Sequence, residues 1–170
     1  MEELVQESIK KTIALDIDGT LFYTSKNPLP DSIEMGFESD KRYVKQRPHL
    51  NLLFEYLDFN KEFFNVIIYS AGTRSYIEQL VNFIEKKHLI SEIYDREFCD
   101  VLTDDDGKLI RIKNYKKINK NLHNLYLVDD KNSHFDNYDV IGYKCKKFKG
   151  EEDDNEILNI IDFLEMLKII

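Results

Sequence analysis

The sequence predicts an α/β fold in which helices cover both faces of a central parallel sheet. Short runs rich in apolar and β-branched residues alternate along the chain with segments whose apolar residues recur at helical spacing. With 170 residues, 42% of them hydrophobic, the chain is long enough for one sizeable core. We therefore expect residues 1–170 to form a single domain.

Four segments are expected as core strands because they combine apolar and β-branched residues: 12–15, 65–69, 125–128 and 140–143. Three segments are expected as helices because their apolar residues recur three or four positions apart: Leu50, Leu53, Phe54 and Leu57; Ile77, Leu80, Val81 and Ile84; and Ile157, Ile160, Ile161, Leu164 and Leu167. Pro48 suits the first turn of the first helix, and the acidic run 151–154 suits the N-terminus of the last.

Two segments interrupt this alternation. Residues 22–45 contain Pro28, Pro30 and Gly36, which indicates an insertion of loop and short strands after the first strand. Its position predicts a lid or a substrate-selecting rim. Residues 103–108 contain an Asp-Gly pair between two β-like runs, which predicts a hairpin turn. A calcium loop is excluded because the liganding glutamate is missing at the required spacing.

The net charge of −8 argues against general affinity for nucleic acid, whose backbone requires a basic surface. Two clusters are locally basic, in contrast to the net charge of the chain: Arg111, Lys113, Lys116, Lys117 and Lys120; and Lys144, Lys146, Lys147 and Lys149. A solvated face explains the second cluster most simply. No run approaches 18 apolar residues, and residues 1–11 are acidic and polar where a signal peptide has an apolar core. We expect a soluble intracellular protein without membrane contact, with Cys99 and Cys145 reduced.

Two aspartates, Asp16 and Asp18, follow the first expected strand, and Gly19 permits a tight turn beyond it. Ligands of open α/β sheets bind at this end of the strands. A carboxylate that attacks a phosphate faces a repulsion of about 4 kcal/mol per pair of unit charges at about 4 Å, which Mg²⁺ offsets by binding both. The pattern therefore suits magnesium-dependent phosphoryl transfer, with Asp16 as nucleophile and Asp18 as general acid and base. An Asx turn after an ordinary strand explains the same residues.

The segment Ser70-Ala71-Gly72 lies between an expected strand and an expected helix. Its hydroxyl and small, open backbone suit a cradle for phosphate oxygens. Ser70 would then donate to the phosphoryl group, although an ordinary N-cap also explains a serine at this place.

Asp129 and Asp130 directly follow the expected strand 125–128, just as Asp16 and Asp18 follow the first strand. Two adjacent acids at a buried strand end are costly without a cation, so one of them could complete the magnesium shell while the other supports it. Lys113 lies between these segments in the sequence, and its point charge could neutralise the phosphate and orient the nucleophile.

The order of these parts, Asp-x-Asp-Gly-Thr, then Ser, Lys and Asp-Asp, resembles the haloacid dehalogenase (HAD) phosphatase superfamily. A closer resemblance is to the FCP/SCP-like phosphatases, also called NLI-interacting-factor-like, which dephosphorylate the C-terminal domain of RNA polymerase II. It rests on segments spread over nearly the whole chain: 43–50, 69–73 with Tyr76, 95–99, 112–113, 128–132 and 153–167. Gly19 stands where many members have glutamate or glutamine, Ser70 stands where threonine is usual, and the insertion is shorter.

This resemblance implies a HAD-like Rossmannoid fold of three layers, Mg²⁺ as cofactor, and an aspartyl-phosphate intermediate. It also implies the following roles: Asp16 as nucleophile, Asp18 as acid and base, Lys113 as a catalytic cation, Thr20, Ser70, Ala71, Gly72 and Arg96 as phosphate or substrate contacts, and Asp16, Asp18 (through its carbonyl), Asp130 and Asp129 at the metal. The implied substrate is a phosphorylated protein, with phosphoserine or phosphothreonine favoured.

Three other functions stay open at this point. A phosphotyrosine-directed relative is the first alternative, since the altered insertion could shape a deeper pocket. Small metabolites or a nucleic-acid 3′-phosphate are further substrate classes. A binding module without catalysis is the last, but such a protein should have lost an aspartate of the first motif, and both are present.

Overall fold

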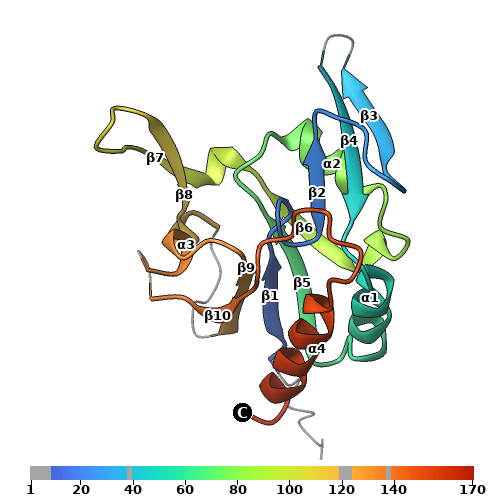
Figure 1. Cartoon of the computed structure of the whole chain (residues 1–170). Helices are drawn as coiled ribbons and strands as arrows, with labels where there is room; N and C mark the ends of the chain where they lie inside the picture. The colour runs from blue at the N-terminus through green and yellow to red at the C-terminus, as the bar shows by residue number, and fades with distance from the viewer. Residues whose placement is uncertain (1–8, 38–39, 119–123, 137–138) are drawn as a thin grey trace, which may run out of the picture.

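The computed structural model of the chain describes residues 9–37, 40–118, 124–136 and 139–170. Its centre is a five-stranded, all-parallel sheet with the strand order β10-β9-β1-β5-β6 (Figure 1). The strands are β1 (Lys11–Leu15), β5 (Phe64–Tyr69), β6 (Ile90–Tyr94), β9 (Leu125–Asp129) and β10 (Ile141–Lys144). The predicted α/β class with a central parallel sheet is confirmed.

Alternate side chains of the central strands enter two apolar clusters, one on each face of the sheet. Ile13 and Leu15 of β1 lie in the larger cluster, with the buried residues of α1 (Leu50–Phe59), α2 (Arg74–Val81) and α4 (Glu156–Leu167). Ala14 lies in the smaller cluster, which is covered by η3 (Tyr115–Ile118) and α3 (Ser133–Asp136). Helices thus cover both faces, with the long ones on one side.

Three details differ from the expectations. The edge strand β6 was not predicted, because its central residues Ser91 and Glu92 are polar and exposed. Helix α1 begins only after His49, which adopts a left-handed conformation (φ 69°), so Pro48 precedes the first turn instead of forming it. Helix α2 ends at Val81, and the buried Ile84 lies beyond it, followed by η1 (Lys87–Leu89).

The insertion is a regular three-stranded antiparallel sheet, with the order β2-β4-β3. Its strands are β2 (Phe22–Ser25), β3 (Ile33–Phe37) and β4 (Asp40–Gln46). Phe22, Met35 and Val44 anchor it in the larger apolar cluster. The insertion sheet stands above the carboxyl ends of the central strands (Figure 1), so it can form one wall of a site there.

A second small sheet projects from the same end of the molecule (Figure 1). It consists of β7 (Cys99–Thr103) and β8 (Leu109–Lys113), which follow η2 (Arg96–Phe98) and pair antiparallel. Gly107 has φ 78° in the connecting turn, as the Asp-Gly pair predicts. The hairpin delivers Lys113 to the central sheet. Among the described helices, none is long and apolar enough to cross a membrane.

Candidate active site

The carboxyl ends of three neighbouring strands bring the predicted residues together. Leu15 of β1 pairs with Val128 of β9 and Ile68 of β5, so the residues that follow lie side by side at one edge of the sheet. Asp16 continues this pairing, because its N–H donates to the Val128 carbonyl (3.0 Å). Asp129 ends β9 and Ser70 follows β5, so acids and a hydroxyl share this edge.

The turn after β1 favours the glycine that this chain has at position 19. Gly19 has φ 75°, and a Cβ there would lie 2.7 Å from Asp130 Oδ2. Arg47, fully buried, holds the turn by donating to the carbonyls of Gly19 (3.3 Å) and Thr20 (3.0 Å) while it forms an ion pair with Asp154 (2.8 Å). Asp130 can therefore approach the turn closely.

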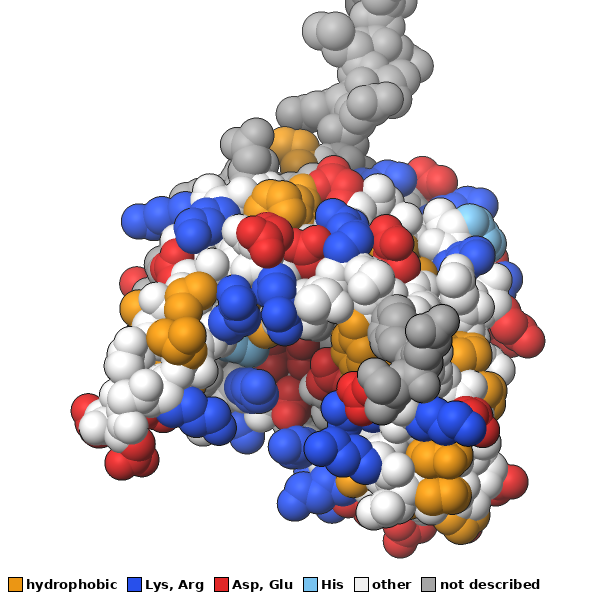
Figure 2. Space-filling view, turned by 90° about the horizontal axis from the view of Figure 1, so that it is seen from above, with side chains coloured by type: hydrophobic (Ala, Val, Ile, Leu, Met, Phe, Trp, Pro, Cys, Tyr) orange, Lys and Arg blue, Asp and Glu red, His pale blue; other side chains and the backbone are white. Residues whose placement is uncertain are grey.

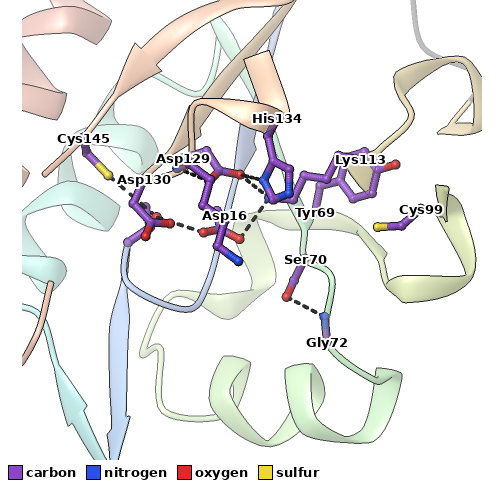
Figure 3. Close-up of polar contacts among 12 residues, drawn as sticks. Asp16, Tyr69, Ser70, Gly72, Cys99, Lys113, Asp129, Asp130, His134 and Cys145 are labelled. Carbon is purple, nitrogen blue, oxygen red and sulfur yellow. Dashed lines mark hydrogen bonds and ion pairs between the residues drawn. The ribbon is translucent and has the colours of Figure 1, made fainter. Parts of the chain in front are cut away.

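Lys113 joins two carboxylates at the centre of the site (Figure 3). Its fully buried ammonium donates to Asp16 Oδ1 (2.9 Å) and to Asp129 Oδ2. Burial lowers the pKa of Lys113, but Asp129 and Asp16 raise it by more, so the net shift is upward. Burial raises the pKa of Asp129, whereas Lys113 and His134 lower it by more. Both groups therefore carry their charges.

His134 of α3 belongs to this network, although no spacing in the sequence indicates a chemical role for it. Its Nδ1 lies 2.8 Å from Asp129 Oδ2, and because Asp129 is ionised this nitrogen is the donor. The backbone N–H of Lys131 donates to the other oxygen, Oδ1 (2.9 Å). Both oxygens of Asp129 are thus engaged, which makes it a positioning group for Lys113.

Asp16, Asp129 and Asp130 each present a carboxylate oxygen within 4.8 Å of the others. Burial and the charge of Asp16 raise the pKa of Asp130 to about 7. Such crowded hard-oxygen donors fit a divalent cation. Lys113 contacts Asp16 through Oδ1, so Asp16 Oδ2 and the Asp130 carboxylate are the atoms that could hold the ion. Thr20, for which we predict a phosphate contact, directs its hydroxyl at these acids, donating to Asp16 Oδ2 (3.0 Å).

Asp18 is separate from this cluster of three carboxylates. It is exposed at the cavity, and the Tyr76 hydroxyl donates to its Oδ1. Surrounding protein atoms and Asp16 raise its pKa, and the Tyr76 hydrogen bond lowers it by less, so the net shift is upward. A carboxyl group that holds its proton more tightly than usual is suited to general acid chemistry. A metal contact from Asp18 would have to come from its backbone carbonyl.

The opposite wall of the site comes from the segment after β5. A cavity of about 460 Å³ is lined by the predicted Asp16, Asp18, Ser70, Ala71, Gly72 and Arg96. The Gly72 N–H donates to Ser70 Oγ (3.1 Å), which leaves the Ser70 hydroxyl hydrogen to donate elsewhere. Helix α2 is capped by Thr73, not Ser70. Arg96 Nε is buried without a partner in the described part of the chain, so it is a donor available to an anion.

The structure thus gathers every predicted site residue around one cavity and its floor. Sequence reasoning missed three residues: His134, Arg47 and Tyr76 as a partner of Asp18. His134 follows Asp129 by five positions, a spacing that carries no recognised pattern. Arg47 precedes Pro48, directly ahead of an apolar helix. Its buried ion pair could not be predicted, because its partner Asp154 lies 107 residues later in the sequence.

Known proteins are similar to this chain over nearly its whole length. A family model described as NLI interacting factor-like phosphatase matches residues 11–169. The chain is 25% identical over 169 residues to CTD small phosphatase-like protein 1 of Caenorhabditis elegans, covering 96% of this chain and 33% of that protein. It is 26% identical over 165 residues to Phosphatase PSR1 of Saccharomyces cerevisiae, covering 94% of this chain and 37% of that protein.

A solved structure of the fission yeast RNA polymerase II CTD phosphatase Fcp1, bound to beryllium fluoride, matches with a TM-score of 0.56 and 16% identity. The match covers 94% of this chain and 51% of that chain, and it confirms the HAD-like fold. The chain spans about a third of the length of the two relatives named above. Because the family model matches nearly the whole sequence, the resemblance inferred from the motifs is confirmed: the chain belongs to the NLI interacting factor-like phosphatase family.

Proposed function

We propose that the protein is a magnesium-dependent phosphatase that hydrolyses phosphoserine or phosphothreonine in proteins through an aspartyl-phosphate on Asp16. One observation carries this proposal. The Asp16 carboxylate is held by Lys113 (2.9 Å) and Thr20 (3.0 Å) at the floor of the cavity, whose opposite wall is lined by Ser70 and Arg96. The buried Nε of Arg96 has no partner among the described residues. A nucleophile and anion-binding donors thus face the same space.

In the first step, an oxygen of Asp16 attacks phosphorus, and the bond to the leaving alcohol breaks. Asp18, whose pKa is raised, gives its proton to the departing oxygen. In the second step, Asp18 accepts a proton from water, whose oxygen attacks phosphorus and releases the Asp16 carboxylate and inorganic phosphate. The proton that Asp18 gives away in the first step is therefore replaced in the second.

The chain's donors stabilise the charge that develops on the transferred group. The Ser70 hydroxyl and the Arg96 guanidinium face the cavity, and Lys113 holds the Asp16 carboxylate in a fixed orientation. Asp16, Asp130 and the Asp18 carbonyl would hold Mg²⁺, which supplies charge neutralisation between the nucleophile and the phosphate. The assignment of a protein substrate is supported by the names of the relatives, of which Fcp1 is described as a CTD phosphatase.

The test is phosphate release from matched phosphoserine, phosphothreonine and phosphotyrosine peptides and from a small aryl phosphate, with Mg²⁺ or with a chelator. We expect magnesium-dependent turnover that falls about a thousandfold or more in Asp16→Asn. Asp105→Asn is the matched control, because Asp105 is exposed in the β7–β8 turn. No turnover of any substrate by folded protein would contradict the proposal. A preference for phosphotyrosine would keep the chemistry and replace the substrate class.

A further inference from the structure

A second cavity, of about 430 Å³, opens beside the catalytic turn, next to the insertion sheet. Three cationic residues from different elements line it: Arg42 from β4, Lys131 after β9 and Lys147 after β10. Tyr23 and Phe148 provide an aromatic wall, with their rings in edge contact at 6.4 Å between centroids. Three carboxylates, of Asp18, Asp40 and Asp130, line it as well, so the cavity places cations beside the acids of the catalytic turn and next to an apolar surface.

The two cavities adjoin each other. Asp18, Asp40, Tyr76 and Lys131 line both of them. One residue of extended chain spans about 3.3 to 3.6 Å. A group bound in the second cavity would therefore belong to a residue close in sequence to the one whose phosphate lies over Asp16.

Lys147 is fixed at the catalytic turn by the backbone on both of its sides. The Phe148 N–H donates to the Gly19 carbonyl (2.7 Å), and the Lys146 carbonyl accepts from Arg47 (2.6 Å). A Cβ at Gly19 would lie 3.2 Å from Lys147 Cγ, so the Lys147 stem packs against the turn. Exposure to solvent is enough to explain the other lysines of this basic cluster. It does not explain why Lys147 is anchored at a cavity.

The whole chain has a net charge of −8, whereas the lining of this cavity has as many cations as carboxylates. Figure 2 shows acidic side chains on the floor of a hollow whose mouth is surrounded mainly by Lys and Arg. Neither Lys131 nor Lys147 forms a salt bridge with a described carboxylate. Arg42 contacts Asp40 (3.1 Å), but this pair is solvent-exposed, and such pairs hold their partners weakly. All three cations are therefore available to a ligand.

We infer that the second cavity binds an anionic group that flanks the hydrolysed phosphate in a phosphopeptide, either a carboxylate or a second phosphate. This rests on the proposed phosphatase function. Lys131 and Lys147 supply point charges on two sides of the group, and the Arg42 guanidinium supplies a fork that matches either anion. The site would then select phosphoproteins whose modified residue lies in an acidic or multiply phosphorylated sequence.

The test compares kcat/KM of the full chain for three phosphoserine peptides: one with neutral neighbours, one with aspartates beside the phosphoserine, and one with a second phosphoserine there. We expect about a fivefold preference for an anionic flank, which weakens as salt is raised. Lys147→Gln should abolish most of this preference. Lys149→Gln is the matched control, because Lys149 is exposed in the same cluster but does not line the cavity.

Equal kcat/KM for all three peptides, or an equal loss on all three in Lys147→Gln, would overturn the inference. A preference for either anionic peptide supports it, and the peptide that is preferred identifies the group. If no peptide is turned over, the proposed function has failed. The anionic site is then tested on its own, by measuring the binding of the labelled doubly phosphorylated peptide by fluorescence anisotropy. Binding that Lys147→Gln alone weakens would support the anionic site, and equal binding by all proteins would overturn it.

Discussion

The floor of the catalytic cavity and the rim that the adjoining second cavity forms use charged residues in opposite ways. On the floor, Lys113 and Asp129 are fully buried, and each contacts the other and a further charged or polar partner. At the rim, Arg42 and Lys147 lie on a surface open to solvent, and the ion pair of Arg42 leaves a third of its side chain exposed. The floor positions a nucleophile, whereas the rim can meet different substrates.

This difference has an energetic consequence. Removing one member of a buried ion pair leaves an uncompensated charge, which typically costs about 3–5 kcal/mol. Removing one member of an exposed pair changes stability by about 0–1 kcal/mol. Substitutions on the floor should therefore affect folding and chemistry together, and substitutions at the rim should affect the choice of substrate alone.

The largest effect is expected for Lys113→Met. It leaves the buried carboxylates of Asp16 and Asp129 without the lysine charge that they share, so the free energy of unfolding should fall by about 3–5 kcal/mol and turnover by about a thousandfold. Arg42→Met, the matched control at the rim, should change the free energy of unfolding by less than about 1 kcal/mol. Urea unfolding measures both. A Lys113→Met protein as stable as the parent would remove the distinction between floor and rim.

Asp130→Asn tests the metal at the floor and should lower turnover about a hundredfold. In the metal-free protein the pKa of Asp130 is raised above its unfolded value, so the stability that its protonated form contributes is lost as pH rises to about 7. Mg²⁺ requires the ionised carboxylate, so it should raise the melting temperature more at pH 8 than at pH 6. Asp130→Asn should lose this magnesium effect. A magnesium effect that is independent of pH and of Asp130 would contradict the assignment.

Arg96→Ala tests whether this residue of the cavity wall acts in substrate recognition or in the chemical step. Arg96 lines the cavity, and its buried Nε has no partner within the described residues. We expect its loss to lower kcat/KM for phosphopeptides about tenfold, and less for a small aryl phosphate. Arg96→Lys keeps the charge without the fork and should recover only part of the loss. Equal losses on both substrates would move Arg96 from substrate recognition to the chemical step.

The sequence was most informative where residues follow buried parallel strands. Asp16 and Asp129 could be placed together because parallel strands end at the same edge and because their apolar runs were unmistakable. The edge strand β6 escaped prediction, since an exposed strand with Ser91 and Glu92 lacks that apolar run. The pairing of β3 with β4 also could not be predicted, because it depends on packing against the core through Met35 and Val44.

The network around Asp129 shows a second limit. Its strand position was readable, but its partners depend on how α3 docks against η3, where the Tyr115 hydroxyl donates to the His134 carbonyl (3.0 Å). No local pattern in the sequence encodes that contact. A histidine among exposed polar neighbours is therefore indistinguishable by sequence from His88, which the structure leaves exposed.

His134→Leu should have the smallest effect, because Lys113 and the Lys131 N–H still hold Asp129. We expect a loss of about 1–3 kcal/mol in the free energy of unfolding, the typical contribution of a hydrogen bond to a charged group, and a few-fold loss in kcat with KM unchanged. His134→Asn, which can still donate, should recover part of kcat, and His88→Leu should change neither quantity. If His134→Leu instead matched Lys113→Met, the histidine would be as necessary as the lysine for holding the nucleophile, and the floor would act as one cooperative unit.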